Sequence, residues 1–375
     1  MTHPTPQNMA KKSLEHLDAE HLQPFRQALS NVLLTPVAES TYAQIIDGMP
    51  LSAVYKRNHW YSENLPVETY DVLCTGSLEK AISFRSSFDF TSLQFEAKTV
   101  QAYQNTAPGS VAWKLRLLEL LPVAIHDIAT TLWSLDDGVH KHAELEAWLT
   151  SRLESGPLDE NERVNLPPHT WFWHYDYEDH KQYPKGVADV VGYWAETQIF
   201  GGVVLFDRGE SDEECNGVYL HNANISMYSY TIAPPKEDQF NDLIGFLLSP
   251  SPDTAQSPLP IAITTANKWR WDPWDAMGTY HIFRDRYERQ LPPRHLYRRK
   301  HNVKFNDWPE LADISILRRE AFSGIPVSEA EKAAAKERVM QITPSSRYWQ
   351  YYKDEICRLQ PVKKMQGRPP YFFDA

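Results

Sequence analysis

Cysteine is scarce in this chain of 375 residues, which contains only Cys74, Cys215 and Cys357. The number is odd and no two of them form a Cys-x-x-Cys pair, so the spacing argues against a disulfide framework and against a structural zinc site. We therefore expect no bound metal, and we expect a reducing, cytoplasmic setting.

Long uninterrupted apolar runs are also missing. The longest run, over residues 111–135, is broken by Lys114, Arg116 and Glu119, which a membrane-spanning helix would not tolerate. The polar start of the chain carries no apolar segment typical of a signal peptide. We therefore expect a soluble protein without a membrane partner, and the sequence leaves its oligomeric state open.

Nucleotide-binding motifs are absent as well. The chain has no Gly-x-Gly-x-x-Gly, no phosphate-binding loop and no protein-kinase motif set. Their absence argues against direct use of a dinucleotide or of ATP, and we expect no cofactor.

The pattern of elements predicts an α+β protein, with an α-rich N-terminal half packed on a largely antiparallel, β-rich C-terminal half. Four regions are expected. They are a polar arm over residues 1–30, a mainly helical region with short strands over 31–160, a β-rich region with the candidate site over 161–320, and a C-terminal helix and tail over 321–375. The boundary between the halves is placed in the polar, proline-containing segment 155–168.

Individual elements follow from periodicity. Helices are expected over residues 111–135, with a kink or break at Pro122, and over 140–153, 236–248 and 328–341, the last opening with the capping box Ser328-x-x-Glu331. Strands are expected over 70–77, 190–206, 217–232, 261–265 and 279–283, and a strand or aromatic loop over 84–95.

The segment Trp171–His221 is the densest in aromatic, acidic and histidine residues. Such a mixture is typical of a polar pocket with aromatic walls. Tyr175, Asp176 and Glu178 are candidate catalytic residues because they can move protons. Trp173 and Trp194 are candidate substrate-binding residues.

The same segment allows one metal hypothesis. His174-x-Asp176 matches part of the triad of two histidines and a carboxylate that holds ferrous iron, with His221 or His281 as the third ligand. The match is short, and no arginine follows His221 at the spacing expected for binding 2-oxoglutarate. An iron oxygenase stays an alternative.

An acidic connection follows the expected strand that ends at Phe206. Asp207 and Glu210 flank Arg208-Gly209, and Asp212, Glu213 and Glu214 come next. Carboxylates bind a guanidinium through charge-assisted hydrogen bonds, so Asp207 and Glu210 are candidates for binding a cationic substrate, with Glu210 also a candidate catalytic residue. The alternative is an ordinary solvated turn.

Gly76-Ser77 ends a short apolar run. A serine at such a turn can present a nucleophilic hydroxyl beside amides that stabilise an oxyanion, so Ser77 is a candidate catalytic residue. The Gly-x-Ser-x-Gly frame of hydrolases is missing, and a serine is also a common helix N-cap.

Positive charge is concentrated in one strip, although the whole chain has a net charge of −11. Residues 280–305 hold eight basic residues against two acidic ones, interleaved with aromatic rings and histidines. Such a strip suits a single-stranded RNA end, although a solvated basic face is the alternative. The candidate RNA-binding residues are Arg284, Arg286, Arg289, Arg294, Arg298, Arg299 and Lys300.

Three blocks carry a resemblance to a known family. They are LDDGVHKHAELEAW, YPKGVADVVGYWAETQIFGGVVLFDRGESDEECNGVYLH and IFRDRYERQLPP. Over about residues 70–310 the chain resembles fungal arginine-containing cyclodipeptide synthases, which use charged tRNA. The resemblance implies secondary metabolism, with arginyl-tRNA and a second aminoacyl-tRNA as partners. The Asp-Asp-x-x-Glu motif of that family has no literal copy here, which leaves the catalytic residues open. Asp136-Asp137 and Asp207-x-x-Glu210 are the nearest forms.

We therefore expect an aminoacyltransferase that forms an arginine-containing cyclodipeptide. The second amino acid stays open. Besides the iron oxygenase, two further functions are compatible with the sequence. One is a cofactor-free cyclase or isomerase of natural-product biosynthesis, and the second is a non-enzymatic binding module with Trp269, Trp271 and Trp274 as its surface.

Overall fold

The computed structural model describes residues 10–58, 65–156, 166–167, 169–222, 231–291 and 308–359. The chain divides into two compact units. The first unit comprises residues 1–204, 223–226 and 238–261, and the second comprises 205–222, 227–237 and 262–375.

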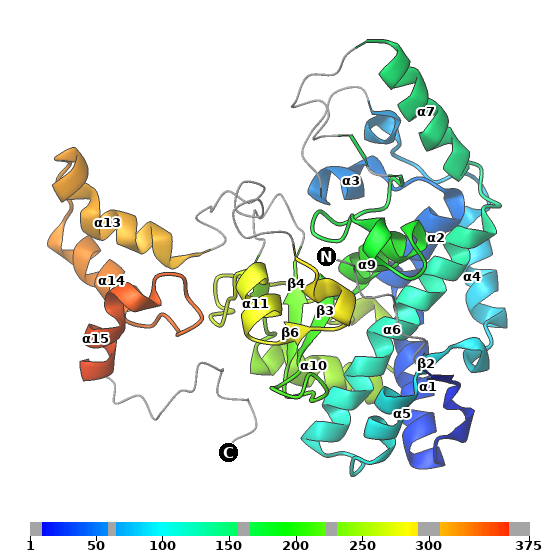
Figure 1. Cartoon of the computed structure of the whole chain (residues 1–375), viewed down its shortest axis with the longest axis horizontal. Helices are drawn as coiled ribbons and strands as arrows, with labels where there is room; N and C mark the ends of the chain where they lie inside the picture. The colour runs from blue at the N-terminus through cyan, green and yellow to red at the C-terminus, as the bar shows by residue number, and fades with distance from the viewer. Residues whose placement is uncertain are drawn as a thin grey trace. The chain divides into compact units, whose positions relative to one another are not determined.

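Helices build the first unit (Figure 1). In chain order they are α1 (Ala19–Leu33), α2 (Pro36–Asp47), α3 (Ser52–Asn58), α4 (Ser77–Ser87), α5 (Ala97–Gln104), α6 (Val111–Leu135), α7 (His142–Glu154), α9 (Val187–Phe200) and most of α10 (Glu237–Leu248). A two-stranded ribbon pairs β1 (Lys11–Lys12) with β2 (Phe95–Glu96). Short 3₁₀ turns lie at Leu14–His16, Pro66–Thr69, Phe90–Ser92, His180–Gln182 and Thr254–Gln256.

The long helix α6 is the centre of this unit and contacts α1, α2, α5 and α9 (Figure 1). Its apolar residues point to several sides, and most of them are buried. Pro122 lies inside the helix without ending it, although proline supplies no N–H for the helical ladder. Helix α9 packs closely on α6 at Gly192, where an added Cβ would lie 2.5 Å from the His126 ring.

The second unit contains most of a four-stranded sheet in the order β5-β4-β3-β6. The strands are β3 (Val203–Asp207), β4 (Val218–His221), β5 (Ile232–Ala233) and β6 (Ile282–Phe283). β6 pairs antiparallel with β3, and β5 pairs antiparallel with β4. The helices of this unit are α11 (Pro273–Thr279), α13 (Glu310–Ser323), α14 (Glu329–Val339) and α15 (Trp349–Leu359), with a 3₁₀ turn at Arg286–Arg289. α13 packs against α14.

The mixed α+β class is confirmed, but helix dominates and the C-terminal half is not clearly β-rich. The expected helices over 111–135, 140–153 and 236–248 are present, and the hydroxyl of Ser328 caps α14 by accepting from Glu331 N at 3.2 Å. Within the described residues, no helix combines the length and the apolar character needed to cross a membrane.

The strand expected over 190–206 is wrong for most of its length, because residues 187–200 form α9 and only 203–207 form β3. A continuously apolar run fits a buried helix as well as a buried strand, and α9 is buried on nearly all sides. Gly201, with φ of 91°, ends the helix in a conformation that favours glycine.

Further strand predictions also fail. Residues 70–76 form a loop and turn that lead into α4. For residues 84–95, a strand or an aromatic loop was expected: 84–87 belong to α4, 88–94 form a loop with a 3₁₀ turn at Phe90–Ser92, and Phe95 lies in β2. Residues 261–265 form no strand. The expected strands over 217–232 and 279–283 shrink to β4 and β6, with residues 223–230 outside the described part. Short apolar runs carry too little periodicity to separate a strand from a packed loop.

Candidate functional site

Three segments of the first unit bring Asp47, Cys74 and His140 together. Asp47 is the last residue of α2, Cys74 lies in the turn before α4, and His140 lies just before α7. One ligand atom from each side chain lies within 4.8 Å of the others. Tyr70, Ser77 and Glu144 contact these three residues, and we call the six together the Cys74 cluster.

Two glycines allow the segments to approach. Gly48 ends α2 with φ of 96°, and a Cβ there would lie 1.6 Å from the carbonyl oxygen of His140. A Cβ on Gly138 would lie 2.0 Å from the carbonyl oxygen of Ile46. The backbone N–H of His140 then donates to the carbonyl of Asp47 at 2.9 Å. The position of His140 is therefore set by backbone contact with the end of α2.

The Asp47 side chain is fully buried. Its Oδ1 accepts from the Ser77 hydroxyl at 2.8 Å, and its Oδ2 accepts from the Tyr70 hydroxyl and, at 3.5 Å, from Cys74 N–H. Among the residues that the structure describes, no lysine or arginine forms an ion pair with it. A buried carboxylate is costly without compensation, and here neutral donors provide it.

Cys74, His140 and Glu144 form a chain of polar contacts. The Sγ atom of Cys74 lies 3.8 Å from Nε2 of His140, and Nδ1 of His140 lies 3.2 Å from Oε2 of Glu144. When Nδ1 donates its hydrogen to Glu144, Nε2 carries the lone pair that faces the thiol. This is the arrangement of a nucleophile, a base and a residue that orients the base.

Tyr70 links both parts of the cluster. Its hydroxyl donates to Asp47, accepts from Cys74 N–H at 3.0 Å and lies 3.6 Å from Cys74 Sγ. Its ring meets the His140 ring edge to face with centroids 4.9 Å apart. Burial, together with its hydrogen bond to Asp47, raises the pKa of Tyr70 well above 10, so the hydroxyl stays protonated.

The cluster lies at the N-terminus of α4. Gly76 is the N-cap residue with φ of 94°, and nothing lies within 4 Å of the position of its missing Cβ. The amides of a first helical turn have no carbonyl partner within the helix. Ser77 N–H already donates to the Cys74 carbonyl at 3.2 Å, so the amides suited to hold an oxyanion formed by attack of Cys74 on a carbonyl group are those of Leu78 and Glu79.

The structure places Ser77, a predicted catalytic residue, inside this cluster. It is buried, it is the first residue of α4 rather than its N-cap, and its hydroxyl donates to Asp47. The base His140 contacts Cys74 instead. The geometry thus favours Cys74 as nucleophile and gives Ser77 a positioning role.

The predicted pocket residues of segment 171–178, and Trp194 of α9, also lie in the first unit. Trp173 and Trp194 are buried, and the Trp194 ring meets Phe172 with centroids 4.7 Å apart. Tyr175, Asp176 and Glu178 are partly buried. The hydrogen bonds of Ser77 lead to Asp47 and Cys74 and not to this segment.

The iron hypothesis receives no support from the described residues. The group of three potential metal-ligating side chains found in them is Asp47, Cys74 and His140, and it does not include His174 or Asp176. His174 is buried, and its Nδ1 accepts from the backbone N–H of Asp176 at 3.1 Å.

The acidic loop after β3 lies in the second unit. Asp207 is buried, and its Oδ1 accepts from Gly209 N at 2.9 Å, which stabilises the turn. Glu210 is exposed. Asp212 pairs with His281 Nδ1 at 2.5 Å and with Arg289.

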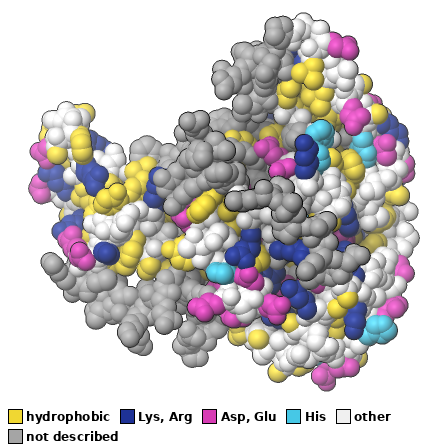
Figure 2. All heavy atoms as spheres, viewed as in Figure 1, with side chains coloured by type: hydrophobic (Ala, Val, Ile, Leu, Met, Phe, Trp, Pro, Cys, Tyr) yellow, Lys and Arg dark blue, Asp and Glu magenta, His cyan; other side chains and the backbone are white. Residues whose placement is uncertain are grey.

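Part of the basic strip is described. Arg284 is buried and pairs with Asp285 at 3.0 Å, whereas Arg286 and Arg289 stand over the rings of Tyr287 and Phe283. Arg294, Arg298, Arg299 and Lys300 lie outside the described residues. On the face drawn in Figure 2, basic and acidic side chains of the described parts are interspersed.

A second polar cluster is buried between α6 and α9. His126 contacts Asp189 at 3.0 Å through Nε2 and Glu196 at 2.8 Å through Nδ1. Burial tends to raise the pKa of Asp189, but the hydrogen bond and charge of His126, aided by the amide and charge of Lys185, lower it below 3.8. Each ring nitrogen of His126 contacts one carboxylate of α9, so the side chain is suited to a structural role that joins α6 to α9.

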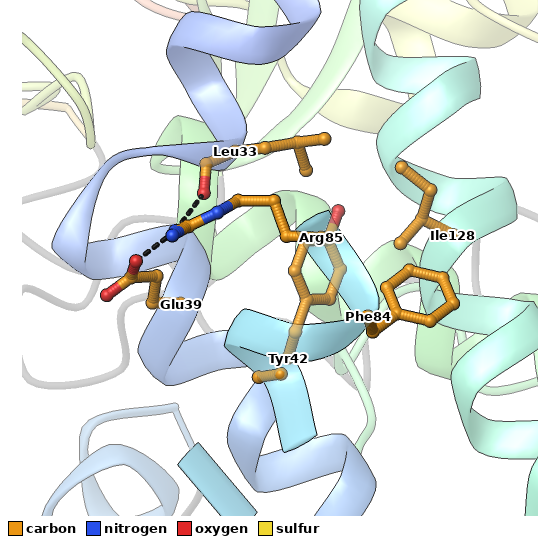
Figure 3. Close-up of a pocket in the computed structure, with 7 residues that line it drawn as sticks. Leu33, Glu39, Tyr42, Phe84, Arg85 and Ile128 are labelled. Carbon is orange, nitrogen blue, oxygen red and sulfur yellow. Dashed lines mark hydrogen bonds and ion pairs between the residues drawn. The ribbon is translucent and has the colours of Figure 1, made fainter. Parts of the chain in front are cut away.

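Two hollows lie near the opposite end of α4. One, lined by Tyr42, Phe84 and Ile128 and bordered by the contact of Arg85 with Glu39, holds about 10 Å³, which is room for about one water molecule (Figure 3). The second is a groove of about 460 Å³ whose lining includes Phe88 and Lys185. Neither includes a residue of the Cys74 cluster.

Sequence reasoning missed Asp47, Cys74, His140 and Glu144 as site residues. The number and spacing of cysteines indicate a site mainly where two cysteines are close in the sequence, and no other cysteine is close to Cys74. The available signal was the neighbourhood of Gly76-Ser77 together with a histidine and a carboxylate four residues apart, His140 and Glu144.

Comparison with known proteins adds no relative. No protein-family model matches the chain, and neither the curated proteins nor the solved structures contain a significant match.

Proposed function

We propose that the protein is an acyltransferase in which Cys74 is the nucleophile, and that its reaction is the formation of an arginine-containing cyclodipeptide from charged tRNA. The observation that carries the chemistry is the contact chain from Cys74 Sγ to His140 Nε2 and from His140 Nδ1 to Glu144. The choice of substrate depends on the resemblance in sequence.

The first step is transfer of an aminoacyl group to Cys74. His140 accepts the thiol proton, and the thiolate attacks the ester carbonyl of the charged tRNA. The first-turn amides of α4 stabilise the oxyanion. The carbon–oxygen ester bond then breaks, His140 returns the proton to the ribose oxygen, and a thioester remains.

The second step makes the product. The amino group of a second aminoacyl-tRNA attacks the thioester, which forms the first peptide bond and releases the Cys74 thiol. The free amino group of the resulting dipeptidyl-tRNA then attacks its own ester, which closes the ring and releases the second tRNA. Both esters are already activated, so the reaction needs no ATP.

The remaining residues of the cluster position the nucleophile. Asp47 accepts hydrogen bonds from Ser77 and Tyr70, and Tyr70 in turn accepts from Cys74 N–H. Burial of Asp47 holds this network in one arrangement, which fixes the thiol beside the base.

Intact-mass spectrometry tests the proposal. The full chain is incubated with arginyl-tRNA in the presence of a chelator, quenched in acid and weighed. We expect a mass increase of one arginyl group, located on Cys74 by peptide mapping and absent in Cys74→Ala. Cys215→Ser is the matched control, because Cys215 is a partly buried cysteine outside the cluster, and it should be acylated like the wild type.

Product analysis provides the second measurement. Expression in a bacterial host and mass spectrometry of the medium should reveal an arginine-containing diketopiperazine that disappears with Cys74→Ala. Undiminished product from folded Cys74→Ala would rule out Cys74 as the nucleophile, and no product from soluble wild-type protein would count against the cyclodipeptide reaction.

A further inference from the structure

We propose that Asp47, Cys74 and His140 also form a zinc site, and that zinc bound there switches the enzyme off. The binding site is argued from the geometry alone, whereas the inhibition rests on the proposed role of Cys74 as nucleophile. The three side chains supply a carboxylate oxygen, a sulfur and an imidazole nitrogen, all of which are zinc ligands.

The distances suit a tetrahedral ion. Zinc bonds of about 2.3 Å to sulfur and about 2.0 Å to nitrogen place these two atoms roughly 3.6 Å apart in a tetrahedron. Cys74 Sγ and His140 Nε2 are 3.8 Å apart, and the oxygen of Asp47 lies within 4.8 Å of both. Movements of a few tenths of an ångström to about one ångström would bring the three ligands onto one ion.

The surrounding contacts are those of a metal site. Histidine ligands commonly donate their other ring N–H to a carboxylate, and Glu144 is placed to accept from Nδ1 of His140 at 3.2 Å. Carboxylate ligands are commonly held by a hydrogen bond on the second oxygen, and Ser77 donates to Oδ1 of Asp47 at 2.8 Å. Both contacts orient the ligands without using the sulfur, Nε2 or Oδ2, the atoms that would bind the ion. The Tyr70 hydroxyl and Cys74 N–H contact Oδ2 in the metal-free cluster, and the ion would replace the Tyr70 contact.

Charge gives an independent reason for a cation. Asp47 is 0% exposed, and no lysine or arginine of the described residues pairs with it. A buried carboxylate is stabilised more by a paired cation than by neutral donors alone. A divalent ion bound here would pair with Asp47 and with the thiolate of Cys74, its second anionic ligand.

Metal binding and acyl transfer exclude each other. The ion would use the sulfur electrons that attack the ester and the Nε2 lone pair that accepts the proton. Three protein ligands leave the fourth position to water. Available zinc would therefore control the fraction of active enzyme in a reversible way.

Cobalt spectroscopy tests the site without any substrate. The full chain, freed of metal and kept reduced with a phosphine, is titrated with Co²⁺, which reports a thiolate ligand by a charge-transfer band and a tetrahedral site by visible bands. We expect saturation at one equivalent, displacement by Zn²⁺, and loss of the thiolate band in Cys74→Ser. The Cys215→Ser control should behave like the wild type.

A second variant distinguishes weaker metal binding from loss of the folded structure. Glu144 is about half exposed, so Glu144→Gln should keep the fold while weakening Co²⁺ binding by roughly tenfold to a hundredfold. Absence of a thiolate band from folded wild-type protein, or an unchanged band in Cys74→Ser, would overturn the site.

The inhibition is measured separately. One equivalent of Zn²⁺ should reduce acylation of Cys74 by arginyl-tRNA at least tenfold, and a chelator should restore it. A cobalt site with acylation unaffected by Zn²⁺ would overturn the switch. A cobalt site with no acylation in chelator would leave the metal site standing and remove the proposed function instead.

Discussion

The imidazole Nε2 of His140 lies 3.8 Å from the sulfur of Cys74, although the two residues are 66 positions apart in the chain. Contact between the end of α2 and residues 138–140 makes this meeting possible, because His140 N–H donates to the carbonyl of Asp47. The candidate chemistry of the protein depends on this approach, and so do the first predictions.

Replacement of the base should slow acylation strongly. We expect His140→Asn to lower the rate of Cys74 acylation by about 10²- to 10⁴-fold, because general-base catalysis contributes about that much. Glu144→Gln should cost less, since Glu144 only orients the ring and is about half exposed. Single-turnover kinetics with arginyl-tRNA in chelator measures both, and an equal effect of the two variants would contradict this assignment of roles.

Gly48→Ala should destabilise the first unit more than Gly76→Ala. Both glycines have φ above 90°, so each alanine costs about 1 to 2 kcal/mol in backbone strain. Only at Gly48 does the new Cβ meet the backbone, 1.6 Å from His140 O, whereas Gly76 has open space. Urea unfolding compares the two variants, and equal losses would show that the close approach at Gly48 contributes nothing.

Ser77→Ala should lower the free energy of unfolding by about 1 to 3 kcal/mol, because it leaves a buried carboxylate oxygen of Asp47 without its donor. Ser86→Ala is the matched control on the same helix. Ser86 is exposed and bonds only the carbonyl of Ile82, so its loss should stay within about 0.5 kcal/mol. Denaturant midpoints at neutral pH measure both changes.

The interface between α6 and α9 should weaken in acid. The pKa of Asp189 is lowered in the folded state, so its contribution to stability is complete above its ordinary value of 3.8 and is lost as the pH falls through the lowered value. Asp189→Asn should reduce stability at neutral pH and flatten its decline in acid. Measurements of the free energy of unfolding across this pH range test the prediction. If this free energy falls as steeply in acid for Asp189→Asn as for the wild type, Asp189 is not the cause of the decline.

The basic strip should contribute to tRNA binding if charged tRNA is the substrate. Charge reversal at Arg298, Arg299 and Lys300, which lie outside the described residues, should weaken binding and make it less dependent on salt. Affinities measured at several salt concentrations test this. Unchanged binding in the folded triple variant would remove the strip from the tRNA site.

The sequence alone was sufficient to predict a helix where a long apolar segment or a capping motif marked it. The apolar residues between Val111 and Leu135 predicted α6, and the Ser328-x-x-Glu331 box predicted the start of α14. It failed for α9, because an apolar run buried on all sides has no periodicity that separates helix from strand.

The candidate site was only partly accessible from sequence. Composition and local turn signals directed attention to Gly76-Ser77, which lies at the cluster. Only the tertiary structure decided that Cys74, His140 and Asp47 meet, because their contact arises from the packing of three separate segments and from two glycines that allow the backbones to touch. Local sequence determines helices and caps through short-range contacts, whereas a site built across segments exists only after the core has packed.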